Sequence, residues 1–366
     1  MLSGNLRVAV LLVTALLSFP RLASATTSVE EANTLTRQFV QRTMTEERIP
    51  GLQIAVIKDG KVVLSESHGW ANVENKVPVT PKTLFPINSA AKTFTGVAMM
   101  QLVEAGRVDL DAPISRYLYD LPTAWQSIRV RQLLGHTSGL PDIVDQHGLI
   151  GGGTELDAWK AVKALPMEAP IGDQFAYNQT NYGLLAQIII KQTGMAYEQY
   201  LAQRQFAPVN MPLTTFGDSY DLLPNAVTMY SYSPRGTLAK NDGDRLSHWV
   251  YDIPYSLWAG GGIQTTADEL SRWLIAVSNG WLISKDDLQR MWTPEKLNDG
   301  TDSDWSAGWP VLQAAPPRQV AGIGGARAAF FVYPDDGLAI VILTNLAGVN
   351  PQRFIPKIAE FYTAQR

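Results

Sequence analysis

Runs rich in β-branched and aromatic residues lie near both ends of the chain, and helical patterns fill the region between them. The runs 52–58 and 61–65 flank Asp59-Gly60. Asp-Gly between two such runs predicts a tight hairpin. A second hairpin is expected from 328–333 and 338–344, joined by the Pro-Asp-Asp-Gly turn at 334–337.

Several stretches have the apolar spacing of helices. The segment 93–104 is apolar on most sides and stops at Gly106, which predicts a buried helix. The segment 267–278 follows Thr266, a residue suited to cap a helix N-terminus. Further helices are expected at 29–47, 130–134, 182–192 and 351–364.

Strands at both ends and helices between them predict an α+β fold, an α/β sandwich with one antiparallel sheet built from both termini. Flanking helices would cover that sheet, and a helical subdomain would lie beside it. A chain of 366 residues is long for a single core, which agrees with two subdomains. We expect the sheet subdomain at 26–86 and 320–366, the helical subdomain at 87–319, and the active site between them.

The first residues have the layout of a secretory signal peptide. One positive charge precedes an apolar run at 8–19, and Ala23-Ser24-Ala25 offers a small-residue cleavage site. We expect cleavage after Ala25, a mature domain at 26–366, a periplasmic or secreted location, and no stable membrane anchor. An uncleaved segment acting as an anchor is the alternative. The chain has no cysteine, so stability must come from its core.

The net charge and the motifs exclude several classes of function. The net charge of -4 and the absence of basic runs give no basis for nucleic-acid binding. The four histidines lack metal-ligand spacing, so neither a metal site nor a cofactor is expected. The glycine runs 151–153 and 260–262 lack a following Gly-Lys-Ser/Thr and indicate loops rather than phosphate-binding turns.

The segment 85–96 contains the strongest chemical signal. Ser89 and Lys92 are three residues apart at the start of the buried helix, so they share a helical face. A serine near a helix N-terminus has free backbone N–H groups beside it, which suits a developing oxyanion. The spacing is that of a nucleophile with its own base, although S-x-x-K is frequent by chance.

Other motifs in the chain strengthen this interpretation. Tyr177 stands in a turn before an apolar helix, and 134–140 reads Leu-Gly-His-Thr-Ser-Gly-Leu. With the hairpin after Pro50-Gly51, the turn at 260–268 and the closing hairpin, these motifs resemble the serine β-lactamase and penicillin-binding protein superfamily. The resemblance covers nearly all of the mature chain and lies closest to the class C β-lactamase, D,D-peptidase and esterase branch.

The resemblance implies a role for each motif residue. Ser89 would be the acylated nucleophile, Lys92 would take its proton or hold the base deprotonated, and Tyr177 would carry a proton to the leaving group. Gln179 stands where the family's Tyr-x-Asn motif has Asn. Its side chain is one methylene longer, so we expect the contacts with the substrate amide to shift and the fold to stay the same.

The larger departure from the family lies in its third motif, which normally places Lys or His before Thr or Ser and Gly. This chain has Gly322, Ile323, Gly324 and Gly325 there, with no cation. The backbone N–H of Gly325 can still form the oxyanion hole with that of Ser89. What is missing is the usual partner of a substrate carboxylate. Arg327 could replace it, or could point into solvent.

The sequence therefore predicts an exported serine hydrolase for a small-molecule ester, amide or peptide. The missing cation favours a carboxylesterase or an atypical peptidase. A penicillin-binding D,D-carboxypeptidase or class C-like β-lactamase is one alternative, and a non-catalytic muropeptide-binding protein is another. His136 is expected to stabilise the loop beneath the site. The tryptophans are expected mainly in the core, with Trp258, Trp305 and Trp309 as candidates for an acyl pocket.

Overall fold

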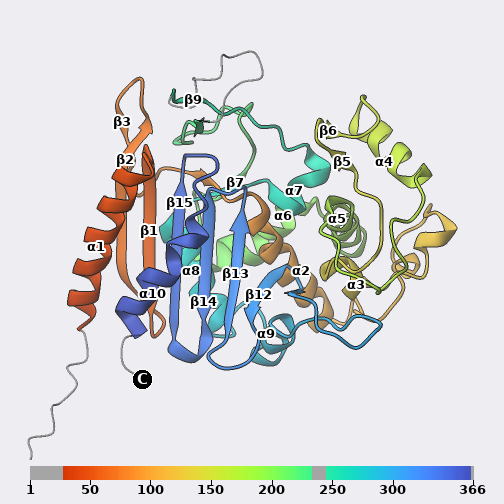
Figure 1. The fold of residues 1–366 in the computed structure, drawn as a ribbon. Coiled ribbons are helices and arrows are strands. Elements are labelled where there is room, and N and C mark those ends of the chain that lie inside the picture. Colours follow the sequence, from red (N-terminus) through yellow and green to blue (C-terminus); the bar gives the residue numbers. More distant parts are fainter. Residues whose placement is uncertain (1–27, 233–244, 364–366) are drawn as a thin grey trace, which may run out of the picture.

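An eight-stranded sheet forms the centre of the computed structural model, which describes residues 28–232 and 245–363 (Figure 1). The strand order is β11-β12-β13-β14-β15-β1-β2-β3, and every neighbouring pair is antiparallel. The pair β15–β1 joins the last strand of the chain to the N-terminal hairpin. The expected α+β fold with one antiparallel sheet from both termini is confirmed.

Both expected hairpins form. β1 (Gly51–Lys58) and β2 (Lys61–Asn72) are joined by Asp59 and Gly60, whose φ angles of 50° and 74° are those of a primed turn. β14 (Ala328–Tyr333) and β15 (Leu338–Thr344) keep the bounds that the pattern indicated. The other strands of this sheet are β3 (Val77–Pro78), β11 (Trp305–Ser306), β12 (Trp309–Gln313) and β13 (Gln319–Gly324).

Helices cover both faces of the sheet. α1 (Val29–Glu46) packs on α10 (Ile355–Thr363), which packs on β15, while α8 (Ala267–Ser278) packs on β1 and β15. The side chains of β15 alternate between the two faces of the sheet. Ile340 and Ile342 pack in the hydrophobic cluster beneath α10, whereas Val341 packs in the cluster that includes residues of α8. A strand buried on both faces is continuously apolar, as β15 is.

A buried helix links the sheet to the helical region. In α2 (Lys92–Glu104), residues 92–102 are all buried, as its apolar composition predicted. α5 (Gln179–Thr193) and α7 (Trp258–Gly261) pack against it, and α3 (Val130–Leu134) and α6 (Tyr197–Leu201) pack against α5. α4 (Glu155–Ala164) lies at the outer edge of the helical region, away from α2 (Figure 1). α9 (Lys285–Met291) follows α8 along the chain.

Short elements complete the description. A three-stranded sheet orders β4 (Phe85–Pro86), β10 (Ile263–Thr265) and β7 (Thr215–Phe216), and two strand pairs join β5 (Val144–Asp145) to β6 (Gly148–Leu149) and β8 (Tyr230–Ser231) to β9 (Ser247–His248). 3-10 turns occupy Asn88–Ala91, Ile114–Arg116, Thr123–Trp125, Ala207–Val209, Tyr255–Leu257, Pro334–Asp336 and Pro351–Arg353, and a π turn occupies Ala202–Phe206.

The expected boundary of the helical part needs correction. β11 and β12 belong to the main sheet although they lie inside 87–319, and α8 from the same range covers a sheet face. β11 has only two residues and β12 contains Pro310, so neither carries the long apolar signal of a central strand. The signal peptide expected at 1–25 lies outside the described residues. Within the described ranges, no helix is both long and apolar enough to cross a membrane.

Candidate active site

Ser89 lies in the turn that leads into α2. The 3-10 turn Asn88–Ala91 passes directly into the helix at Lys92. The turn is fixed to neighbouring strands because the N–H of Ile87 donates to the carbonyl of Ile263 at 3.1 Å. Ser89 is half-buried, while both of its chain neighbours are buried. The hydroxyl therefore stands on a rigid support at the junction of the sheet and the helical region.

Lys92 is fully buried, and its ammonium group is held by partners from two other helices. Nζ donates to Oε1 of Gln179 at 2.9 Å and to the carbonyl of Gly260 at 3.0 Å. The same nitrogen lies 4.8 Å from the ring centre of Tyr177 and 5.0 Å from that of Tyr182, within cation–π range. These contacts compensate the burial of the amine and fix its position at the N-terminal end of α2.

Tyr177 is placed by the start of α5. The next residue, Asn178, caps this helix by accepting from the N–H of Asn181 at 3.0 Å, and its amide donates to the carbonyl of Leu140 at 2.6 Å. The Tyr177 side chain is 39% exposed, so one side is open to solvent and the other faces Lys92. Lys92, Tyr177 and Gln179 thus lie together, and Ser89 lies three residues before Lys92 in the preceding turn.

His136 forms the support beneath Tyr177. The two rings are 4.5 Å apart, and Trp305 lies against both. Nδ1 of His136 accepts from the N–H of Asn178 at 3.2 Å, which places the ring proton on Nε2. Burial, reinforced by the nearby charge of Lys92, lowers the pKa of His136 well below its usual value. The imidazole is therefore neutral, and it holds both the Tyr177 ring and the helix start.

The glycine-rich end of β13 packs against the nucleophile turn. A Cβ on Gly324 would lie 1.8 Å from the carbonyl oxygen of Ile87, so only glycine fits at this contact. Gly325, with a φ of 56°, follows directly; a Cβ there would lie 2.9 Å from Oδ1 of Asn88. Gly325 is thus adjacent to the residue before Ser89. Ile323 is half-buried one residue before Gly324, and Gly322 packs against the ring of Phe330.

Arg327 is buried rather than directed into solvent. Arg327 is only 6% exposed, and its guanidinium lies 4.8 Å from the ring centre of Tyr251. Nε and Nη1 have no hydrogen-bond partner among the described residues. A Cβ on Gly325 would lie 2.7 Å from Nε and 2.9 Å from Nη2, so the cation runs alongside this turn. Burial lowers the pKa of Arg327 from its usual value.

Two groups that contact the site residues could not be predicted from the sequence. The Gly260 carbonyl holds Lys92, but a backbone acceptor depends on position rather than residue type. Oδ1 of Asp142 accepts from the N–H of Gln179 at 3.0 Å, and burial raises the pKa of that carboxyl although Lys92 opposes the shift. Of the tryptophans considered for a pocket, Trp305 touches Tyr177, Trp258 stacks on Phe216, and Trp309 is in the core.

Comparison with known proteins supports the resemblance. The Beta-lactamase family profile matches residues 36–365. The chain is 25% identical over 336 residues to protein flp of Staphylococcus aureus (strain MW2), covering 89% of this chain and 65% of that protein. It is 27% identical over 257 residues to the putative penicillin-binding protein PbpX of Bacillus subtilis (strain 168), covering 70% and 61%. The chain thus spans a little under two thirds of the length of these relatives.

Solved structures show the same fold. A penicillin-binding protein homologue from Pyrococcus abyssi, described as octameric, superposes with a TM-score of 0.76 at 25% identity, covering 91% of this chain and 78% of that one. EstCE1, described as a hydrolase with promiscuous acyltransferase activity, superposes with a TM-score of 0.75 at 20% identity, covering 91% and 99%. Because the family profile covers most of its length, the chain belongs to the Beta-lactamase family.

Proposed function

We propose that this chain is an exported serine hydrolase that forms an acyl-enzyme on Ser89 and acts as a carboxylesterase or an atypical peptidase. The observation that carries the choice is the third-motif segment that starts at Gly322, which has no cation and packs against the Ser89 turn through Gly324. Without that cation, the site lacks the usual partner for the carboxylate of a penicillin or of a peptide ending in D-alanine. Neutral acyl substrates do not need this partner.

The roles of the residues follow from their placement. The Ser89 oxygen attacks the substrate carbonyl and gives its proton to the Lys92–Tyr177 pair. The resulting oxyanion accepts hydrogen bonds from the backbone N–H groups of Ser89 and Gly325. Tyr177 delivers a proton to the leaving group as the carbonyl re-forms and the acyl-enzyme remains. Water then hydrolyses the ester, and the proton returns to Ser89.

Gln179 and the third-motif segment form the substrate contacts in this proposal. The Gln179 oxygen is used by Lys92, so its NH₂ group is the part available to a substrate carbonyl. The end of β13 (Gly322, Ile323 and Gly324) forms the opposite wall. Arg327 lies beside this wall without a counter-ion among the described residues and would pair with a negative charge on the substrate.

That unpaired cation is also the reason to keep a second candidate function. A D,D-carboxypeptidase or class C-like β-lactamase acts on substrates with a free carboxylate, and Arg327 offers such a group a partner. A non-catalytic muropeptide-binding protein is the remaining alternative. The assembled cluster of Ser89, Lys92, Tyr177 and Gln179 speaks against it, because ligand binding alone does not require a buried amine beside the hydroxyl.

Labelling separates these functions. The purified chain is treated with a fluorescent fluorophosphonate and, in parallel, with a fluorescent penicillin, with Ser89→Ala as the matched control. Labelling of Ser89 by the fluorophosphonate alone supports the esterase proposal, whereas stable labelling by both supports the penicillin-binding alternative. If Ser89→Ala leaves the hydrolysis of 4-nitrophenyl esters and D-amino acid amides unchanged, the enzyme proposal is wrong.

Export rests on the N-terminal pattern and is tested separately. The full-length chain is produced in a bacterial host, and its N-terminus is sequenced from the periplasm and the medium. A mature chain that begins at Thr26 agrees with the proposal. An intact Met1 on membrane-bound protein would instead show that the segment is retained as an anchor.

A further inference from the structure

Aromatic side chains extend the candidate active site beyond Tyr177. The Tyr177 ring lies 5.5 Å from the ring of Trp305, which lies 6.0 Å from the ring of Phe175. Phe175 and Tyr177 are each 39% exposed, and Trp305 is half-buried. We call these three side chains the aromatic patch. Solvent reaches the aromatic patch, so part of a bound substrate can reach it as well.

The loop that carries Phe175 is held in place on two sides. The N–H of Ala176 donates to the carbonyl of His136 at 2.8 Å, and the N–H of Asn298 donates to the carbonyl of Gly172 at 2.9 Å. The buried His136 ring lies 4.5, 5.1 and 5.9 Å from the three rings of the aromatic patch. The patch therefore has its shape before a substrate binds, which lowers the entropy cost of binding.

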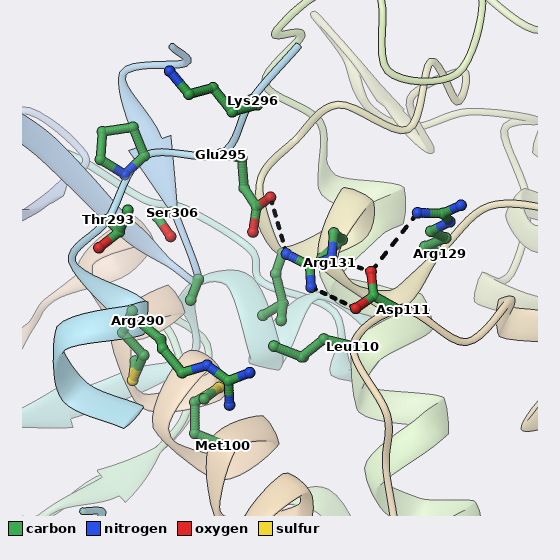
Figure 2. A pocket seen from close by; sticks show the side chains of 14 residues that line it. Met100, Leu110, Asp111, Arg129, Arg131, Arg290, Thr293, Glu295, Lys296 and Ser306 are labelled. Carbon is green, nitrogen blue, oxygen red and sulfur yellow. Dashed lines mark hydrogen bonds and ion pairs between the residues drawn. The ribbon is translucent and has the colours of Figure 1, made fainter. Parts of the chain in front are cut away.

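The backbone of Trp305 is held by the segment that starts at Glu295. The N–H of Glu295 donates to the carbonyl of Trp305 at 3.4 Å. The Glu295 carboxylate lies 3.5 Å from Arg131, and Arg131 also binds Asp111 at 2.7 Å (Figure 2). These ion pairs connect the segment that carries Trp305 to α3, so both ends of the aromatic patch are fixed.

The position of Tyr177 decides which part of a substrate meets the aromatic patch. In the proposed function, on which this inference rests, Tyr177 delivers a proton to the leaving group. Its ring contacts both the amine of Lys92 and the ring of Trp305. A leaving group whose oxygen accepts the Tyr177 proton therefore lies next to the other two rings of the patch.

The chemistry of the patch favours a neutral aromatic group. Aromatic rings attract one another in stacked and edge-to-face arrangements, beyond the effect of burying their surface. The neighbours of the patch along the chain include the exposed acids Asp173 and Asp304. Their negative charges disfavour an anionic group at this place.

We infer that the aromatic patch binds the leaving group of the substrate, and that this group is an aromatic alcohol such as a benzyl alcohol. The Ser89 oxygen bonds to the acyl carbon, the bond from that carbon to the alcohol oxygen breaks, and this oxygen takes its proton from Tyr177. Phe175 and Trp305 contact the departing ring. They determine specificity and take no part in the bond breaking.

Two acetate esters test this inference. Benzyl acetate and cyclohexylmethyl acetate carry rings of similar size on primary alcohols, so they differ mainly in aromaticity. We expect the wild-type kcat/KM to be about threefold or more higher for benzyl acetate. Phe175→Leu keeps an apolar side chain but loses the ring, and should reduce this ratio to about one. Trp281→Leu, which removes an exposed aromatic side chain after α8, is the matched control and should keep the wild-type ratio.

Binding to the Ser89→Ala chain separates this inference from the proposed function, because no acyl-enzyme forms there. Saturation-transfer NMR titrations should give a Kd for benzyl acetate about threefold lower than for cyclohexylmethyl acetate, and adding Phe175→Leu should abolish the difference. If this holds while the wild type hydrolyses neither ester, the inference is upheld and the esterase proposal fails. Equal kcat/KM for the two esters, equal Kd values, or a benzyl preference that survives Phe175→Leu overturns the inference.

Discussion

Nζ of Lys92 donates to Oε1 of Gln179 at 2.9 Å, across 87 residues of sequence. Gln179 is the residue by which this chain departs from the Tyr-x-Asn motif. Its side chain is longer than that of Asn and accepts a hydrogen bond from the amine of Lys92. Because the second acceptor is the fixed carbonyl of Gly260, the side chain of Gln179 is the adjustable half of this support.

Replacing Gln179 by Ala should therefore lower kcat more than it raises KM. A hydrogen bond to a charged group contributes ~1.5–3 kcal/mol, so we expect kcat for a 4-nitrophenyl ester to fall about tenfold or more. Gln174→Ala, at an exposed position of the same loop, is the matched control. Steady-state kinetics of the two variants decides the matter, and equal kcat values would mean that Gly260 alone holds Lys92.

Replacing Arg327 by Met should change which substrates are hydrolysed without lowering the stability of the fold. Exchanging a buried, unpaired charge for an apolar group of similar length is expected to leave the melting temperature unchanged or to raise it. Hydrolysis of an ester that carries a free carboxylate should fall about tenfold or more relative to a neutral ester of the same leaving group.

The control for that experiment is Arg318→Met, because Arg318 is paired with Asp335 at 2.7 Å. This variant should lose stability without changing the ratio of the two ester rates. If Arg327→Met lowers both rates by the same factor, Arg327 does not select the substrate charge.

Gly324→Ala tests the contact between β13 and the nucleophile turn. The added methyl group would lie 1.8 Å from the Ile87 carbonyl oxygen and would displace backbone, so we expect a loss of ~1–3 kcal/mol in the free energy of unfolding together with reduced acylation of Ser89. Urea denaturation and fluorophosphonate labelling measure the two effects.

Gly261→Ala is the matched substitution for Gly324→Ala. Its methyl group would meet Ile253 at 3.6 Å and the backbone of Asn88 at 3.8 and 3.9 Å, all of them ordinary van der Waals contacts. We expect stability and labelling close to those of the wild type. A Gly324→Ala variant that labels as fast as Gly261→Ala would show that β13 does not position the turn.

His136 should make stability depend on pH. Its pKa in the folded chain is lowered by burial and by Lys92, so the unfolded chain binds a proton first as pH falls. The stabilisation by the neutral ring is complete above the ordinary histidine pKa of about 6.5 and is lost as pH falls below it, by up to ~1.4 kcal/mol per pH unit.

The measurement is the urea midpoint between about pH 7.5 and 5 for the wild type and for His136→Phe, with the ordinary histidine pKa in the middle of that window. The difference between the two should narrow as pH falls, because the phenyl ring cannot bind a proton. His147→Phe, at an exposed position, should follow the wild type. A constant difference between His136→Phe and the wild type would mean that His136 is not neutral in the folded chain.

Local patterns in the sequence determined a large part of this structure. The Asp59-Gly60 turn, the bounds of α8 and the closing hairpin depend on neighbouring residues and a repeating period, so they were predictable. The placement of Lys92 one turn after Ser89 was predictable for the same reason, since residues three apart share a face.

Contacts between distant segments were decided by the tertiary structure alone. Sequence alternation left the direction of Arg327 open, and only packing against Tyr251 and Gly325 buried it. β11 and β12 joined the main sheet because β13 offered them a free edge, which their own short patterns do not encode. The Gly260 carbonyl lies within hydrogen-bonding distance of Lys92 because α2 and α7 pack against each other. Such contacts depend on where whole elements lie, and no local spacing specifies that.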